Sequence, residues 1–214
     1  MESLDELLQQ AEVAHGHLCA GQVLGVRMAM LGCQRLGITE PRGTDRKRLV
    51  TYIEIDRCAT DAIGVVTGCR LGKRALKFRD WGKMAATFVD LATRRAIRIV
   101  ALDSSKQRAK ELYPEIADKN KQQMKAYREM ADGELFGEQW VEVEVGPKEM
   151  PGYKGERVKC GVCGEGINYE RFVERDGERL CLGCAHPEQR YYRTARGETA
   201  RDAVVESVSR CECA

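Results

Sequence analysis

Two short cysteine pairs near the C-terminus constrain the fold more than any other feature of this sequence. Cys160 and Cys163 form the first pair, Cys181 and Cys184 form the second, and seventeen residues separate the pairs. Two such pairs at this separation supply four thiolates for one tetrahedral zinc ion. A segment of about thirty residues cannot hold a fold by apolar burial alone, so we expect the metal to supply much of its stability.

Other uses of these four thiols stay open. The pairs could be separate redox centres, or the thiolates could hold an iron–sulfur cluster. His186, two residues after Cys184, could also replace one cysteine ligand. A site with four protein ligands is closed, so we expect a structural zinc. Between the pairs, the sequence predicts a β-hairpin that turns at Asp176-Gly177, a favoured type I′ pair.

Composition restricts the class of protein. The chain has 214 residues, 43% of them hydrophobic, which suits a medium domain with a small module. Its 35 basic and 33 acidic residues nearly balance, so nucleic-acid contact is open but not favoured. The acidic N-terminus does not resemble a secretory signal, and no apolar run is long enough to span a membrane. We expect a cytoplasmic protein whose ten cysteines serve metal sites rather than disulfides.

Periodicity and turn residues predict an ordered series of helices and strands. Helices are predicted over 3–17, 18–37, 57–69 and 103–133, with Pro114 interrupting the last, and strands over 48–56, within 71–83, in a hairpin over 85–102 and over 138–145. Ser3 and Glu6 predict a capping box, and Gly37 predicts a helix end. We expect a core domain over 1–150, a cysteine module over 151–190 and a charged tail over 191–214.

The helix predicted over 18–37 is apolar on most sides, which is typical of a central, buried helix. Its small residues would let neighbouring elements approach closely. They are Ala20, Gly21, Gly25, Ala29 and Gly32.

A histidine and cysteine cluster precedes this helix. In an extended segment His15, His17 and Cys19 would point to one side, whereas in a helix only His15 and Cys19 share a face. A cysteine near a helix N-terminus is favoured as the thiolate. Imidazole and thiolate together suit zinc, iron, nickel or copper. The residues alone leave a metal or catalytic site and an ordinary buried helix entrance equally open.

A second group of polar residues could complete such a site. Glu54 and Asp56 end a predicted strand, and Cys58 and Asp61 open the next helix. Cys58 and Asp61 lie three residues apart, so they share one helix face. A glycine-rich turn with Cys69 and Lys73 follows.

Three ordered blocks resemble the FmdE family, which is named after a component of formylmethanofuran dehydrogenase. They are HGHLCAGQVLGVRMA, EIDRCATDAI and TGCRLGKRALKFRDWGKMA. The matching positions are His15, Gly16, His17, Cys19 and Gly21, then Glu54, Cys58, Asp61 and Ala62, then Gly68, Cys69, Gly72, Lys73, Asp80, Gly82 and Lys83. Arg70 departs from the pattern, because the resemblance leads us to expect a small hydroxyl residue there.

The resemblance implies an α+β fold, in which an antiparallel sheet packs with helices, and a homodimer. It implies that some members carry a C-terminal treble-clef zinc finger, which matches Cys160 to Cys184. It also implies a metal near the His/Cys block. As partner it implies the molybdenum or tungsten dehydrogenase that fixes carbon dioxide onto methanofuran, in one-carbon metabolism and methanogenesis.

Three functions are consistent with these observations. The first is a metal-binding protein accessory to that dehydrogenase, with His17, Cys19 and Cys58 as ligands of a second transition metal (zinc, iron or nickel). His15 or Asp61 would then be the fourth ligand or orient one. The second is a self-standing enzyme, for which Cys19, Asp61 and Lys73 are the candidate catalytic residues. The third is a module in which the zinc finger binds protein or nucleic acid.

Two further features have more than one interpretation. Lys73 and Lys83 could bind an anionic group, although exposed lysines usually need no such role. Cys211 and Cys213 in the tail could form a third metal or redox site, or belong to a frayed terminus.

Overall fold

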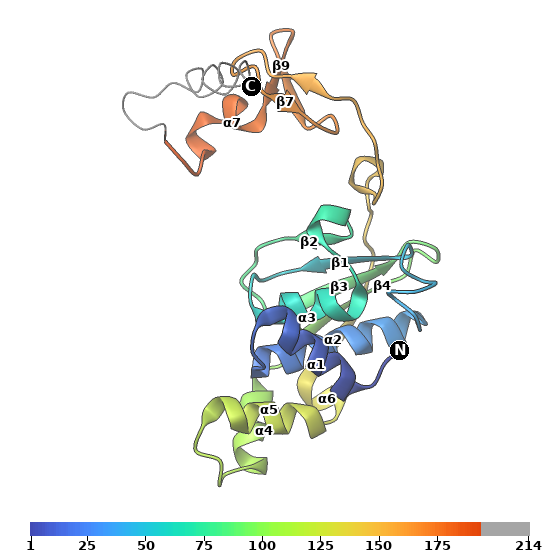
Figure 1. Ribbon diagram of the computed structural model, residues 1–214, viewed down its shortest axis with the longest axis vertical. Coiled ribbons are helices and arrows are strands. Elements are labelled where there is room, and N and C mark those ends of the chain that lie inside the picture. The colour runs from blue at the N-terminus through green and yellow to red at the C-terminus, as the bar shows by residue number, and fades with distance from the viewer. Residues whose placement is uncertain (194–214) are drawn as a thin grey trace, which may run out of the picture. The chain divides into compact units, whose positions relative to one another are not determined.

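The computed structural model describes residues 1–193, so Cys211 and Cys213 lie outside the described residues. The chain forms two compact units, Met1–Tyr153 and a second unit that begins at Lys154. The predicted α+β class is confirmed, because the first unit combines one sheet with a layer of helices (Figure 1).

The first unit contains a five-stranded sheet in the order β2-β1-β3-β4-β5. Its strands are β1 (Leu49–Ile53), β2 (Leu76–Phe78), β3 (Ala85–Asp90), β4 (Ala96–Ala101) and β5 (Phe136–Val141). Every neighbouring pair is antiparallel except β1 and β2, which are parallel. The prediction of an antiparallel sheet therefore holds for three pairs of four. The parallel pair arises because a helix crosses over between these two strands.

Capping residues and a proline mark several helix ends in this unit. The helices are α1 (Leu4–His15), α2 (Ala20–Leu36), α3 (Cys58–Thr67), α4 (Ser104–Leu112), α5 (Lys119–Glu129) and α6 (Asp132–Leu135), with short 3-10 turns at Leu71–Lys73 and Pro147–Glu149. The predicted capping box of Ser3 with Glu6 is present, and Gly37 ends α2 in the left-handed conformation. Pro114 lies between α4 and α5, as predicted. No described helix is long and apolar enough to cross a membrane.

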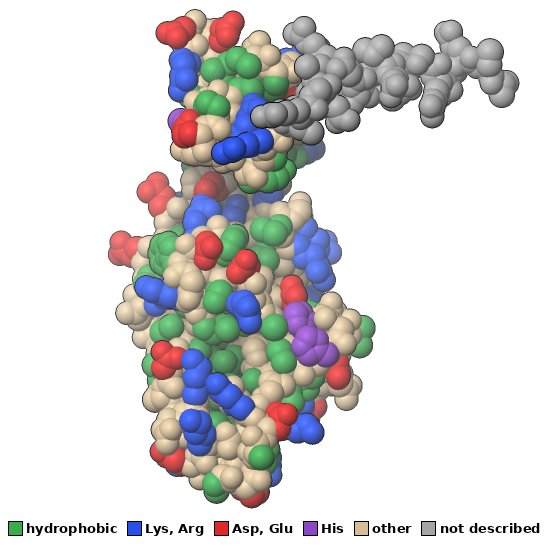
Figure 2. All heavy atoms as spheres, turned by 90° about the vertical axis from the view of Figure 1, so that its left-hand side faces the viewer, with side chains coloured by type: hydrophobic (Ala, Val, Ile, Leu, Met, Phe, Trp, Pro, Cys, Tyr) green, Lys and Arg blue, Asp and Glu red, His purple; other side chains and the backbone are tan. Residues whose placement is uncertain are grey.

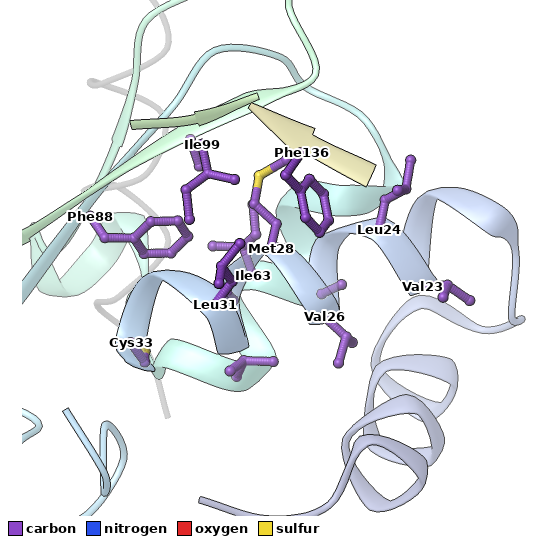
Figure 3. Close-up of a cluster of buried hydrophobic side chains, with 14 of the residues drawn as sticks. Val23, Leu24, Val26, Met28, Leu31, Cys33, Ile63, Phe88, Ile99 and Phe136 are labelled. Carbon is purple, nitrogen blue, oxygen red and sulfur yellow. The ribbon is translucent and has the colours of Figure 1, made fainter. Parts of the chain in front are cut away.

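Helix α2 is the centre of the core. Twelve of its seventeen residues are buried, which confirms the prediction of a central helix. Figure 3 shows Met28 and Leu31 of α2 beneath Phe88, Ile99 and Phe136, which come from three strands of the sheet. The hairpin predicted over 85–102 is formed by β3 and β4 and supplies two of these side chains.

Two glycines let α2 approach its neighbours closely, as predicted. A Cβ atom added to Gly25 would lie 2.5 Å from the carbonyl oxygen of Ala59 in α3. One added to Gly32 would lie 2.4 Å from the ring of Phe88 in β3. Because real Cβ atoms do not approach other atoms this closely, no larger residue fits at either position without displacing α3 or the sheet.

An ion pair between a buried carboxylate and a partly buried guanidinium lies where β1 ends. Glu54 is 3% exposed, and both of its carboxylate oxygens accept hydrogen bonds of 2.7 Å from the Arg98 guanidinium on β4. The backbone carbonyl of Glu54 also accepts hydrogen bonds from Trp81 and Lys83. Glu54 therefore joins β1, β4 and the loop between β2 and β3.

The second unit is built around two small sheets. Its elements are β6 (Val158–Lys159), β7 (Gly166–Ile167), β8 (Phe172–Arg175), β9 (Glu178–Cys181), α7 (Leu182–Ala185) and a 3-10 turn at Pro187–Gln189. Strands β8 and β9 form the predicted hairpin, and Asp176 and Gly177 both have positive φ, as a type I′ turn requires. Among the described residues of this unit, 154–193, the buried side chains form a small cluster, namely Cys160, Ile167, Leu180 and Ala185.

We predict that Gly25→Ala lowers the free energy of unfolding by about 1–3 kcal/mol, because the new methyl group collides with the α3 backbone. Alanine is the better helix former, so a stabilised variant would contradict this packing. Gly133→Ala in α6 is the matched control, since a Cβ there meets no atom within 4 Å. Urea unfolding of both variants provides the measurement.

We also predict that Glu54→Gln lowers the free energy of unfolding by about 3 kcal/mol, because it leaves the Arg98 charge without its carboxylate. Glu138→Gln is the control. Glu138 makes the same two-bond contact with Arg35, but that pair lies on the surface and its loss should cost under about 1 kcal/mol. Equal losses in the two variants would show that burial of the Glu54 pair has no energetic consequence.

Candidate metal centres

The junction between α1 and α2 carries the predicted His/Cys cluster. Gly16 ends α1 with a φ of 93°, a conformation that suits glycine and lets the chain turn after His15. The residues 16–19 form a short connection, and Cys19 is the N-cap of α2 with extended backbone angles. Cys19 thus lies just before the first helical turn of α2, whereas the helix predicted over 18–37 includes it.

His15, His17 and Cys19 converge. One ligand atom from each of the three lies within 4.8 Å of the others, close enough for all to hold one metal ion. The imidazole rings of His15 and His17 have centroids 4.8 Å apart. Figure 2 shows the two histidines of the core unit together on its surface. His15 and Cys19 are half-buried and His17 is exposed, so the cluster is open to solvent on one side.

Helix α3 brings Cys58 and Asp61 to this cluster in its first turn. The Asp61 carboxylate lies 2.8 Å from Nδ1 of His15. Burial raises the pKa of the Cys58 thiol, and a hydrogen bond with the Cys19 side chain raises that pKa further. A Cβ on Gly21 would lie 3.2 Å from Cβ of Cys58 and 3.7 Å from Sγ of Cys19. The side chains of Cys19 and Cys58 therefore lie beside each other next to Gly21, while Cys58 and Asp61 stay outside the compact group of His15, His17 and Cys19.

Residues that sequence reasoning missed hold this arrangement. The buried side chain of Gln22 donates a 2.7 Å hydrogen bond from Nε2 to the carbonyl oxygen of Cys58. The side chain of Asn120 in α5 accepts a 3.0 Å hydrogen bond from the backbone N–H of Ala20 and so caps α2. Asn120 is a hundred residues away in sequence, and no local pattern signals its contact. A polar residue at an otherwise apolar helix position was the only available signal for Gln22.

Other predicted site residues lie elsewhere. Glu54 is engaged by Arg98. Lys73 precedes β2, which runs parallel to β1, so it lies at the sheet end where β1 begins, opposite to Cys58. Cys69 is buried, and burial raises the pKa of its thiol.

The four cysteines of the second unit also converge. One Sγ atom from each lies within 4.8 Å of the others, and Sγ of Cys163 is 3.9 Å from Sγ of Cys181. A tetrahedral zinc ion with bonds of about 2.3 Å separates its sulfur ligands by about 3.8 Å. The cluster therefore fits zinc. His186 is outside this compact group, and its ring lies 3.6 Å from Glu188.

Backbone groups favour the thiolate of Cys160, whereas burial raises the pKa of Cys163 to about 12 and also raises the pKa of Cys184. Burial opposes ionisation of Cys160, but backbone N–H groups, including a 3.3 Å contact from Cys181, lower its pKa to about 6. The guanidinium of Arg190 lies 3.0 Å from Sγ of Cys184. Positive and N–H groups around the sulfurs are the surroundings that metal-bound thiolates require.

Two segments of the chain match known families. Residues 14–139 match the family described as "FmdE, Molybdenum formylmethanofuran dehydrogenase operon". Residues 153–190 match the "Prokaryotic dksA/traR C4-type zinc finger". The first match includes the His/Cys cluster and the whole described sheet except part of β5, and the second includes all four cysteines of the other cluster.

Two relatives extend these matches. The chain is 31% identical over 206 residues to a "Probable S-adenosyl-L-methionine-binding protein" of Archaeoglobus fulgidus, and the match covers 85% of this chain. It covers 53% of that protein, so the chain spans about half the length of this relative. The crystal structure of a "tungsten formylmethanofuran dehydrogenase subunit e (fmde)-like protein" from Syntrophus aciditrophicus has the same fold. The TM-score is 0.60 at 21% identity, covering 88% of this chain and 95% of that one.

The family match spans more than half of the chain and contains the three sequence blocks around the core cluster. The chain is therefore a member of the FmdE family that also carries a C4-type zinc finger.

Proposed function

We propose that this protein is a metal-binding accessory protein of a molybdenum or tungsten oxidoreductase. The observation that carries the proposal is the convergence of His15, His17 and Cys19 at a site open to solvent on one side. A metal ion held there by three side chains keeps a coordination position for an exchangeable ligand. Such a site suits a protein that assists or delivers to an enzyme.

In this proposal His15, His17 and Cys19 bind a transition metal, which we take to be zinc, iron or nickel. The Cys58 thiol lies beside Cys19 but outside the compact group of three, so in this proposal it hydrogen-bonds the Cys19 sulfur and leaves the fourth coordination position free. Asp61 accepts the hydrogen bond of His15 Nδ1, which leaves Nε2 to face the metal. A carboxylate behind a histidine ligand fixes the ring and makes the imidazole more basic.

We further propose that Cys160, Cys163, Cys181 and Cys184 bind a structural zinc ion. Residues 154–193, the described part of the second unit, bury few apolar side chains, so zinc would supply the stability that burial does not. With four thiolate ligands this zinc has no open position and takes no part in chemistry.

The partner in this proposal is a dehydrogenase assembly. The names of the matched family and of the Syntrophus aciditrophicus protein both include formylmethanofuran dehydrogenase, which supports such an association in one-carbon metabolism. We also propose that the protein is a cytoplasmic homodimer. The core domain would comprise residues 1–150 and the finger 151–190, with the tail beyond.

A second candidate function is binding of S-adenosyl-L-methionine. The name of the archaeal relative supports it, because that protein shares 31% identity with this chain across 85% of its length.

We predict that Cys19→Ala removes the core metal from the purified full chain but leaves the zinc of the finger in place. Cys184→Ala should do the reverse. Elemental analysis of the wild type and both variants measures the two sites separately. Asp61→Asn should retain the core metal and weaken its affinity about 10–100-fold, since it perturbs only the group behind His15.

Cys33→Ala is the matched control for Cys19→Ala. Cys33 is fully buried in α2, and burial raises the pKa of its thiol to about 12, so it cannot serve as a ligand. Loss of metal in the Cys33→Ala protein, or unchanged core metal in the Cys19→Ala protein, would refute the assignment.

The two candidate functions predict different partners. Affinity purification of the full chain from its own cells should recover the proteins of the dehydrogenase. The Cys19→Ala variant should recover them too if the metal is delivered to the enzyme and does not hold the complex together. Equilibrium dialysis with labelled S-adenosyl-L-methionine tests the second candidate. Binding of that ligand without any dehydrogenase component would favour the second candidate over the first.

A further inference from the structure

The loop between β2 and β3, residues 79–84, presents an indole to solvent. Trp81 is 63% exposed, and Phe78 at the end of β2 is 37% exposed. Exposed apolar side chains scattered singly are ordinary, but here two aromatic rings lie within four residues. Asp80, Gly82 and Lys83, which match the FmdE family pattern, lie in this loop. The proposed metal site uses none of these residues.

The loop is held firmly in place. The backbone N–H groups of Trp81 and Lys83 donate hydrogen bonds of 3.1 and 3.2 Å to the carbonyl oxygen of Glu54, which Arg98 fixes through the side chain. The Asp80 side chain accepts a 3.2 Å hydrogen bond from Gly82, whose φ is 62°. The indole is therefore exposed by a rigid loop rather than by a loose one.

A cation accompanies the indole. Nζ of Lys83 lies 5.8 Å from the centre of the Trp81 ring, within the range of a cation–π contact. In the part of the chain that the structure describes, Lys83 has no carboxylate partner. If an aromatic ligand stacked on this indole, an acidic group on that ligand would lie within reach of the Lys83 ammonium group.

The loop is connected to the core cluster through a short series of contacts. Glu54, which carries the loop, is followed by Ile55, whose carbonyl oxygen accepts a 2.6 Å hydrogen bond from Thr60 in the first turn of α3. The same turn supplies Cys58 and Asp61 to the His/Cys cluster. The indole and the cluster therefore flank the same end of β1 and are connected through Glu54, Ile55 and the first turn of α3.

We propose that Trp81 and Lys83 form a subsite for a small molecule with a planar heteroaromatic ring and an anionic group. The ring stacks on the Trp81 indole, and its phosphate or carboxylate pairs with the Lys83 ammonium group. A bound metal at the same end of β1 as this subsite rests on the proposed function. Binding of the ring does not depend on that function.

The chain offers an internal comparison. It has two tryptophans, and Trp140 in β5 is also exposed and stacked with a cation, Arg95, at 4.4 Å. Trp140 pairs with Ile97 from the edge strand β5, and it takes no part in the contacts that join the loop to α3. The two indoles are therefore similar in chemistry and different in surroundings.

Fluorescence of full-length single-tryptophan variants tests the proposal, with AMP as the anionic probe and adenosine as its neutral counterpart. In the Trp140→Phe protein, AMP should change Trp81 emission saturably and bind about threefold more tightly than adenosine, the effect expected of one exposed ion pair. Lys83→Gln should abolish this preference, and Lys83→Arg should keep it. In the Trp81→Phe protein, Trp140 should show no saturable change.

Equal, non-saturating quenching of both indoles would overturn the subsite, as would a preference for AMP that survives Lys83→Gln. An eight-nucleotide oligoadenylate that binds more tightly than AMP, with steep salt dependence, would overturn the small-molecule assignment in favour of a nucleic-acid strand. The titrations are run with metal-free and metal-loaded protein. If the core takes up no metal, the proposed function is wrong, but ring binding at Trp81 and Lys83 is still measured. The experiment therefore distinguishes failure of one proposal from failure of the other.

Discussion

The close approach of α2 to α3 is the constraint on which the rest of the structure depends. At Gly25 the two helices lie so near that an added methyl group would overlap the backbone of Ala59. The spacing of the helices fixes the spacing of what they carry, because Cys19 starts α2 and Cys58 starts α3. At Gly32 the same helix meets the ring of Phe88, so the sheet and the cluster are positioned by opposite ends of one rigid element.

Features set by local chemistry could be predicted from the sequence. The capping box at Ser3, the helix end at Gly37 and the type I′ turn at Asp176 depend only on residues within a few positions, and all three are present. The four cysteines of the second unit converge as their spacing predicted. Short pairs on either side of a hairpin leave the chain few other arrangements.

Features set by distant residues could not be predicted in the same way. Glu54 and Arg98 are 44 positions apart, and nothing near either residue marks the other as its partner. The parallel pairing of β1 with β2 depends on how α3 crosses the sheet, and it places Lys73 at the end opposite to Cys58. Sequence order alone groups Lys73 with the residues of the core cluster. Sequence order does not report the direction in which a strand runs, so it does not separate them.

The two cysteine-containing clusters differ in the number of side chains that converge and in what surrounds them. Four thiols meet in the second unit, where a metal would have no free position and could only stabilise. Three ligands meet in the core at a helix junction that is open to solvent, with Cys58 and Asp61 behind them. A metal site with an open coordination position requires selectivity for the ligand that binds there, whereas a closed site does not. The rigid loop that presents Trp81 and Lys83 is attached to the open cluster through Glu54 and the first turn of α3. A ligand held by that loop would be connected to the helix turn that carries Cys58 through these hydrogen bonds. On the proposed function, any chemistry would belong to the core, and the second unit would be a module that zinc stabilises.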